Sequence, residues 1–70
     1  MADIEAHITG TVFKIHKKVG DQVKKHEEVL LLESMKMEIP VESPVDGTIT
    51  EIRFQKGDNV NEGTVIVVVE

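Results

Sequence analysis

The 70-residue chain contains no cysteine, tryptophan or tyrosine, and its only aromatic residues are two phenylalanines. Without cysteine it can form neither a disulfide nor a thiolate metal site, which fits a reducing compartment, and we expect a cytoplasmic protein. Basic residues are also scarce, because 8 Lys and Arg face 13 Asp and Glu and give a formal net charge of -5. Nucleic-acid binding needs a basic face, so this balance argues against such a partner.

Long apolar runs are absent as well. The longest, Val65 to Val69, is far too short to cross a bilayer, and nothing resembles a signal peptide, so we expect no membrane association. Seventy residues make one domain, residues 1–70, near the lower size limit for a self-sufficient core. We expect this domain to be monomeric by itself.

An internal repeat organises the chain, because residues 6–33 align without a gap on residues 43–70. The matched positions include Gly10-Thr11 with Gly47-Thr48, Ile15 with Ile52, Gly20-Asp21 with Gly57-Asp58, Val23 with Val60, and Glu33 with Glu70. Two copies of a unit that cannot bury its own apolar face would pack on each other around an approximate twofold axis.

Each copy has the pattern of β-strands, since its apolar segments are short, rich in β-branched residues and separated by Gly, Asp, Asn and Pro. Strict alternation breaks at the same place in both copies, after Val12 and after Ile49, which predicts a shared β-bulge. The sequences GDQV and GDNV predict tight turns, with a glycine for positive φ and an aspartate that bonds its own downstream backbone. Six to eight short strands in two related halves predict an all-β flattened barrel, or two-sheet sandwich, with an aliphatic core.

One hairpin tip breaks local rules. Strand-like sequence leads into and out of residues 34–37, which leaves Met35 and Lys36 at the turn. A two-residue hairpin turn requires φ > 0 and therefore favours Asn-Gly, which is absent here. The flanking Glu33 and Glu38 would also face each other across the ladder, where like charges are destabilising. Such violations concentrate at functional sites.

A lysine at this tip is better suited to be a substrate than a catalyst. A nucleophilic or basic lysine needs burial or a cationic neighbour, whereas an enzyme that acylates a lysine needs it to project from a rigid support. The same pattern also fits an ordinary turn, in which Met35 and Met37 are edge contacts and Lys36 is a solvated charge.

The sequence ESMKME, set within the duplicated pattern, closely resembles the biotinyl domains of biotin-dependent carboxylases, whose motif is usually Ala-Met-Lys-Met. The resemblance covers nearly the whole chain. It implies the flattened β-barrel of biotinyl and lipoyl domains, with Lys36 as the biotinylated lysine and Met35 and Met37 as the motif's flanks. It also implies that Glu33, Ser34 and Glu38 contribute to recognition by the ligase and other partners.

The implied function is that of a non-catalytic carrier. A biotin protein ligase would join biotin to Lys36, a biotin carboxylase would load CO2 onto it as carboxybiotin, and a carboxyltransferase would unload it onto an acceptor. Tethering would raise the effective concentration of biotin at both enzymes. Because the repeat places the chain termini where the second copy would have its tip, we expect the termini at the end opposite Lys36.

Three departures from the family pattern concern rigidity. Ser34 replaces the usual Ala, His7 and Thr9 replace prolines, and His26 stands where the second copy has Gly63. If φ is positive at His26, that residue is strained.

Other functions remain open. A lipoyl carrier for acyl or methylamine transfer shares the fold and the tip lysine, but its motif more often reads Asp-Lys-Ala, and an acceptor of both biotin and lipoate is a further alternative. The domain could also be an unmodified adaptor. A metal site is disfavoured, because the spacings of His7, His16 and His26 place no two on one face of a short element.

Overall fold

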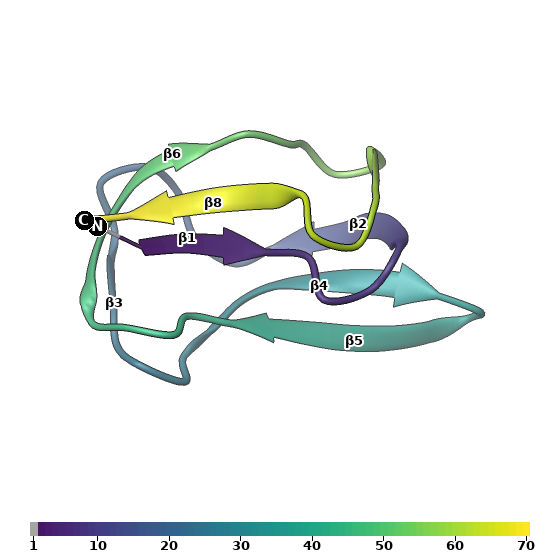
Figure 1. Ribbon diagram of the computed structural model, residues 1–70, viewed down its shortest axis with the longest axis horizontal. Coiled ribbons are helices and arrows are strands. Elements are labelled where there is room, and N and C mark those ends of the chain that lie inside the picture. The colour runs from purple at the N-terminus through teal and green to yellow at the C-terminus, as the bar shows by residue number, and fades with distance from the viewer. Residues whose placement is uncertain (1) are drawn as a thin grey trace.

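The computed structural model describes residues 2–70, which form antiparallel strands and no helix (Figure 1). One sheet has the strand order β1-β8-β6-β3 and the other β5-β4-β2-β7. The two sheets curl around one core as a flattened barrel, which confirms the predicted fold class. The strands are β1 (Ala2–Glu5), β2 (Gly10–Ile15), β3 (Gln22–Val23), β4 (Glu28–Ser34), β5 (Met37–Glu42), β6 (Gly47–Ile52), β7 (Asn59–Val60) and β8 (Val65–Val69). Within these described residues, no helix is long and apolar enough to cross a membrane.

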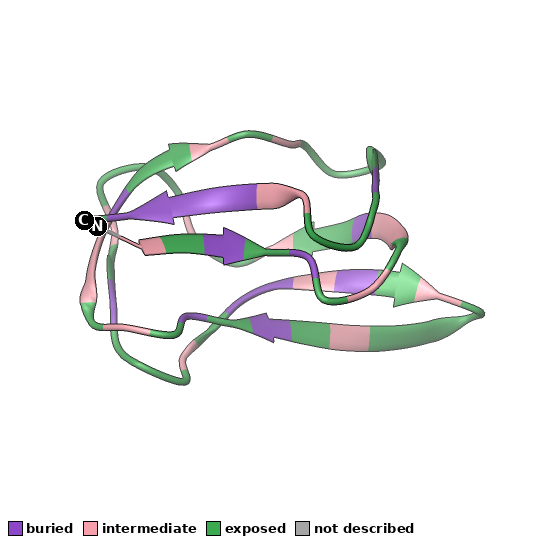
Figure 2. Cartoon of the chain, in the orientation of Figure 1, coloured by how far each residue is buried: buried purple, intermediate pink, exposed green. Residues whose placement is uncertain are grey.

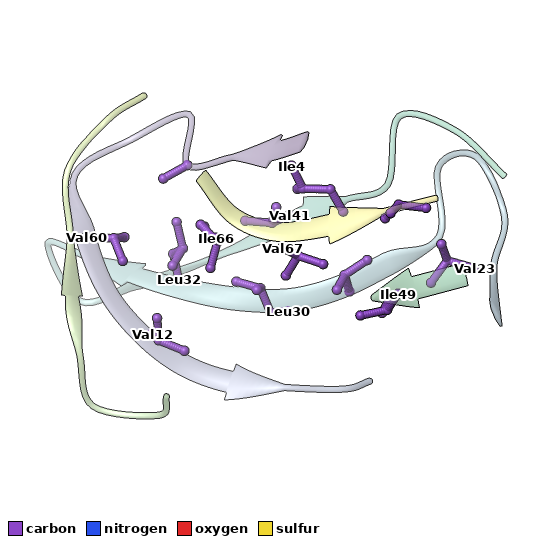
Figure 3. Packing of buried hydrophobic residues seen from close by; sticks show 13 residues of the cluster. Ile4, Val12, Val23, Leu30, Leu32, Val41, Ile49, Val60, Ile66 and Val67 are labelled. Atoms are coloured by element: carbon purple, nitrogen blue, oxygen red, sulfur yellow. The ribbon is translucent and has the colours of Figure 1, made fainter. Parts of the chain in front are cut away.

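The core lies between the sheets and is aliphatic, as the composition predicts (Figure 3). Phe13 is 39% exposed, and Phe54 packs against the edge of the core. Ser43 is buried, and its Oγ donates a hydrogen bond of 2.6 Å to the Val45 carbonyl, so its polar group is satisfied. The buried apolar side chains are Ile4, Ala6, Val12, Val23, Val29, Leu30, Leu32, Val41, Ile49, Val60, Ile66, Val67, Val68 and Val69.

Positions 37 residues apart have matching environments. β2 and β6 share one burial pattern along their lengths, and each carries the predicted register shift, between Val12 and Lys14 and between Ile49 and Glu51. The expected β-bulge is therefore confirmed in both strands. The β4–β5 and β8–β1 ladders also have the same register. Leu31 pairs with Pro40, and the residues 37 positions from each of them, Val68 and Asp3, also pair with each other. Two further pairs of the β4–β5 ladder correspond to pairs of the β8–β1 ladder in the same way, namely Leu30–Val41 to Val67–Ile4 and Leu32–Ile39 to Val69–Ala2.

The turns that precede β3 and β7 follow the predicted glycine rule. Gly20 and Gly57 have φ of 97° and 96°, which strains any residue with a Cβ. The prediction that each aspartate bonds the backbone downstream of it was wrong, because both bond the backbone upstream. Asp21 Oδ2 accepts a hydrogen bond of 2.9 Å from the Lys18 amide, three residues upstream, and Asp58 does the same with Gln55 at 2.8 Å. The carboxylate thus closes the four-residue turn that contains the glycine.

His26 is in the left-handed region, with φ of 74°, where the matched residue of the second half, Gly63, has φ of 88°. The surrounding hydrogen bonds fix this conformation. The His26 amide donates to the Ser43 carbonyl at 2.7 Å, and the Gly63 amide donates to the Ala6 carbonyl at 2.8 Å. His26 therefore carries the backbone strain that its position in the repeat suggests.

We expect His26→Gly to stabilise the protein by about 0.5–1 kcal/mol. Left-handed backbone costs an L-residue roughly 1–2 kcal/mol, and the extra freedom of glycine in the unfolded chain offsets about 0.4–1 kcal/mol of the relief. Urea unfolding measures the difference. Lys25→Gly is the matched control, because Lys25 has no positive φ to relieve and should lose stability. Equal losses in the two variants would show that His26 is not strained.

The β4–β5 hairpin reaches past the other strands at one end of the molecule, while both termini lie together at the other end (Figure 1). The long dimension of the Cα trace is 31 Å, against 19 and 18 Å across it. At the terminal end, Ala2 pairs with Val69, and Thr48 and Glu70 exchange two backbone hydrogen bonds. The expected placement of the termini away from Lys36 is confirmed.

Candidate functional site

The tip of the β4–β5 hairpin is a two-residue turn. Ser34 pairs with Met37, which leaves Met35 and Lys36 as the connection, with φ of 53° and 64°. Positive φ at both central residues is the signature of a type I′ turn, which matches the twist of the flanking strands. Neither residue is Gly or Asn, so each bears a conformational cost of roughly 1–2 kcal/mol. The structure keeps the tight turn in spite of these residues.

The side chains of this turn face solvent. Met35 is 92% exposed and Met37 is 61% exposed, and Lys36 is exposed between them (Figure 2). Within residues 2–70, no carboxylate lies within 4.0 Å of the Lys36 amine. Two surface depressions, one beside Val23 and Gly47 and one beside Glu51 and Val68, lie away from the tip. An amine in this position is accessible to an external enzyme that would transfer a group to it.

The predicted pair of opposed carboxylates lies next to the tip, one step along the ladder from Ser34 and Met37. Glu33 and Glu38 pair directly across the ladder, and both are exposed. On the other side of β4, the β2 backbone approaches so closely that a Cβ added at Gly10 would lie 2.6 Å from the Glu33 carbonyl oxygen. Gly10 therefore permits the close β2–β4 contact that supports the hairpin near its tip. The repeated Gly-Thr pair was the available sequence signal for this role, because Gly47 is equally crowded by Glu70.

Two of the three histidines each lie beside a glutamate. His16 Nε2 lies 2.5 Å from Glu28 Oε2, and His26 Nδ1 lies 3.8 Å from Glu42 Oε1. No group of three or more His, Cys, Asp or Glu in the described part of the chain could hold a metal ion.

At the end of β4 away from the tip, Lys17 forms an ion pair with Glu27. The hydrogen bond from Lys17 lowers the pKa of the Glu27 carboxyl, and a second one from the Lys24 amide acts in the same direction. Because the folded pKa lies below the unfolded one, this carboxylate favours folding at neutral pH, and its contribution is lost as the pH falls through the folded pKa. These contacts order the turn before β4 and take no part in the tip.

A small flattened barrel that presents an exposed lysine on a hairpin tip is the architecture of a biotin/lipoyl carrier domain. Residues 1–69 match the model of the biotin/lipoyl family, described as biotin-requiring enzymes, and the chain belongs to this family. Such domains bear covalently attached biotin or lipoate and are generally non-catalytic.

Two curated relatives are similar over nearly their whole lengths. The biotin/lipoyl attachment protein of Bacillus subtilis is 44% identical over 64 residues, which cover 91% of this chain and 88% of that protein. The biotinylated protein TB7.3 homolog of Mycobacterium leprae is 39% identical over 67 residues, which cover 96% of this chain and 94% of the relative.

Solved structures of a carboxylase and of a lipoyl domain share the fold of this chain. The urea carboxylase of Kluyveromyces lactis superimposes with a TM-score of 0.93 and 29% identity, over 99% of this chain and 6% of that much longer one. The lipoyl domain of the 2-oxoglutarate dehydrogenase complex from Azotobacter vinelandii superimposes with a TM-score of 0.76 and 31% identity, over 96% of this chain and 95% of that domain.

Proposed function

We propose that the protein is a biotin carrier, modified on Lys36, that transports CO2 between a biotin carboxylase and a carboxyltransferase. The observation that carries this proposal is the strained type I′ turn, which presents Lys36 between two exposed methionines. A turn formed by Asn-Gly would be less strained, so the Met-Lys-Met sequence is kept for a reason other than folding. The relative named as a biotinylated protein supports biotin as the attached group.

The tip fits an attached acyl group. Lys36 is exposed and has no ion-pair partner within 4.0 Å among residues 2–70, so loss of its charge breaks no contact there. In the coupling reaction the neutral Nζ attacks the carbonyl carbon of a biotin carboxylate that ATP has activated. The new C–N bond forms, the C–O bond to the leaving group breaks with its electron pair, and the nitrogen loses a proton. All catalytic groups for this step belong to the ligase.

When attached, biotin supplies the site that accepts and releases CO2. The chain's own residues supply reach and position, because the hairpin projects beyond the barrel and Met35 and Met37 flank the point of attachment (Figure 1). The similarity to a domain of a urea carboxylase supports carboxylase enzymes as partners. A tether of this kind raises the local concentration of the attached group at each enzyme.

Lipoate is the second candidate for the same lysine. Two observations favour keeping it, namely the similarity to a lipoyl domain over nearly its full length and the name of the Bacillus subtilis relative, which covers both groups. A lipoyl group would make the protein a carrier for acyl or methylamine transfer.

Intact-mass measurement after modification separates these functions. The purified chain is incubated with ATP and either biotin and a biotin protein ligase or lipoate and a lipoate ligase, and the adduct is mapped by peptide sequencing. We expect one biotinyl group, on Lys36. Modification by lipoate alone would replace the proposed function with the second candidate, and an unmodified Lys36 in both reactions would leave the adaptor function.

A further inference from the structure

The sulfur of this chain is concentrated beside its functional lysine. Cysteine is absent, so the only sulfur atoms belong to three methionines, and two of these, Met35 and Met37, flank Lys36. Met35 is 92% exposed and Met37 is 61% exposed. Oxidation of a methionine thioether to the sulfoxide turns a flexible apolar side chain into a polar, chiral one. An oxidant in the solvent can therefore reach the tip and change the surroundings of Lys36.

Neither the backbone nor the core requires methionine at these positions. Met35 has φ of 53°, and any residue with a Cβ bears the cost of that conformation. Leucine has a similar volume and is equally apolar, so apolar contact alone does not call for a sulfur atom. Within residues 2–70, the buried core cluster is made of Val, Ile, Leu and Ala. Oxidation of Met35 and Met37 would thus leave the packing of the barrel unchanged.

We propose that Met35 and Met37 form a reversible oxidation site, and that their sulfoxides slow the acylation of Lys36. The effect on Lys36 rests on the proposed function, whereas the oxidation itself does not. The oxidant is hydrogen peroxide. A lone pair of the thioether sulfur attacks one peroxide oxygen, and the S–O bond forms as the O–O bond breaks. The departing oxygen takes the bonding pair and, after proton transfer from the other oxygen, leaves as water. Each sulfur loses the two electrons that the peroxide gains.

The sulfoxide can be returned to the thioether. Methionine sulfoxide reductases, one for each sulfoxide epimer, catalyse this step. Two thiols supply the two electrons and become a disulfide, and the sulfoxide oxygen leaves as water. Oxidation at the tip is therefore a modification that can be applied and removed without breaking the chain or the attached group.

The short reach of the unmodified lysine connects oxidation to acylation. Its Nζ is only one side chain away from the hairpin backbone, so an active site that acylates it must also contact the residues on either side. An apolar thioether side chain gains free energy when such a contact removes it from water. A sulfoxide oxygen in the same place loses its hydrogen bonds to water. Acylation by the enzyme should therefore slow, although the amine of Lys36 is chemically unchanged.

Treatment with hydrogen peroxide tests the oxidation site directly. Peptide mass mapping over time gives the rate of sulfoxide formation at each methionine. We expect both rate constants to lie within about threefold of that of free methionine, with Met35 faster than Met37 because it is more exposed. The thermal unfolding temperature should not change, because both side chains lie outside the core. Oxidation far slower than that of free methionine would overturn the assignment of this site.

Biotin incorporation tests the effect on Lys36. For a purified biotin protein ligase, kcat/KM should fall on the order of tenfold in the oxidised protein, because the contact of an apolar side chain is lost. Treatment with the two sulfoxide reductases and a thiol should restore it. The rate at which an activated ester of biotin modifies Lys36 without enzyme should stay the same, since the amine itself is not altered.

The double variant Met35→Leu with Met37→Leu is the matched control. It keeps Met1, and peroxide should leave its own rate of biotinylation unchanged, whatever that rate is. Equal losses in the two proteins, a loss that the reductases do not reverse, or full activity of the completely oxidised protein would refute the effect on Lys36. If the untreated protein takes no biotin on Lys36, the proposed function fails and this effect fails with it. The rates of sulfoxide formation still decide the oxidation site in that case.

Discussion

Lys36→Arg is expected to abolish biotin incorporation while leaving the fold intact. The guanidinium of arginine stays protonated in proteins, so it has no free electron pair with which to attack an activated carboxylate. The barrel should tolerate the change, because Lys36 is exposed and contacts no carboxylate within 4.0 Å in the described chain. Streptavidin binding and intact mass measure the modification, and circular dichroism with thermal unfolding measures the fold.

Lys56→Arg is the control for the chemistry of the substitution, since Lys56 is also an exposed turn lysine but lies outside the hairpin. It should be biotinylated at the rate of the unsubstituted protein. Biotin still bound covalently to the Lys36→Arg variant would place the attachment on a different lysine and refute the assignment of Lys36.

Leu30→Ala should have the largest effect on stability, a loss of about 2–5 kcal/mol. Leu30 is fully buried at the centre of the core between the two sheets (Figure 3). A domain of this length has roughly 4–10 kcal/mol of stability in total, so the variant should be partly unfolded at 37 °C. Urea unfolding followed by circular dichroism measures the loss.

The next residue along β4 gives the control. Leu31 points to the outward face and is only partly buried, so Leu31→Ala should cost less than about 1 kcal/mol. Equal losses of stability in Leu30→Ala and Leu31→Ala would contradict the assignment of Leu30 to the core and Leu31 to the outward face.

Much of this architecture follows from the sequence, because the 37-residue offset carries geometric information. The Gly-Asp turns, the bulges after Val12 and Ile49, and the exposed Met-Lys-Met tip are all encoded in local residue types. The strain at His26 was also predictable, since Gly63 shows what the backbone requires at the matched position.

The pairing of Glu28 with Glu42 could not be predicted in this way. From the tip to Leu30, the numbers of paired residues add up to 71, so simple extension of the ladder would place Glu28 opposite Ser43. The register shift between Glu28 and Leu30 brings Glu42 there instead. A one-residue shift of this kind depends on packing between strands, which residue types along one strand do not specify. Similarly, the sequence shows that Met35 and Lys36 are unfavourable in a two-residue turn, but not that the chain accepts positive φ at both.

Both termini lie at one end of the long axis, so rotation of the domain about that end moves Lys36 at the opposite end. A chain that continues from Ala2 or from Glu70 would hold the barrel at the end away from Lys36, as the pairing of Ala2 with Val69 requires. For any given angle of swing about that point, the hairpin tip describes the widest arc available, because it lies at the far end of the 31 Å dimension. Small rotations at that end thus become large displacements of the lysine.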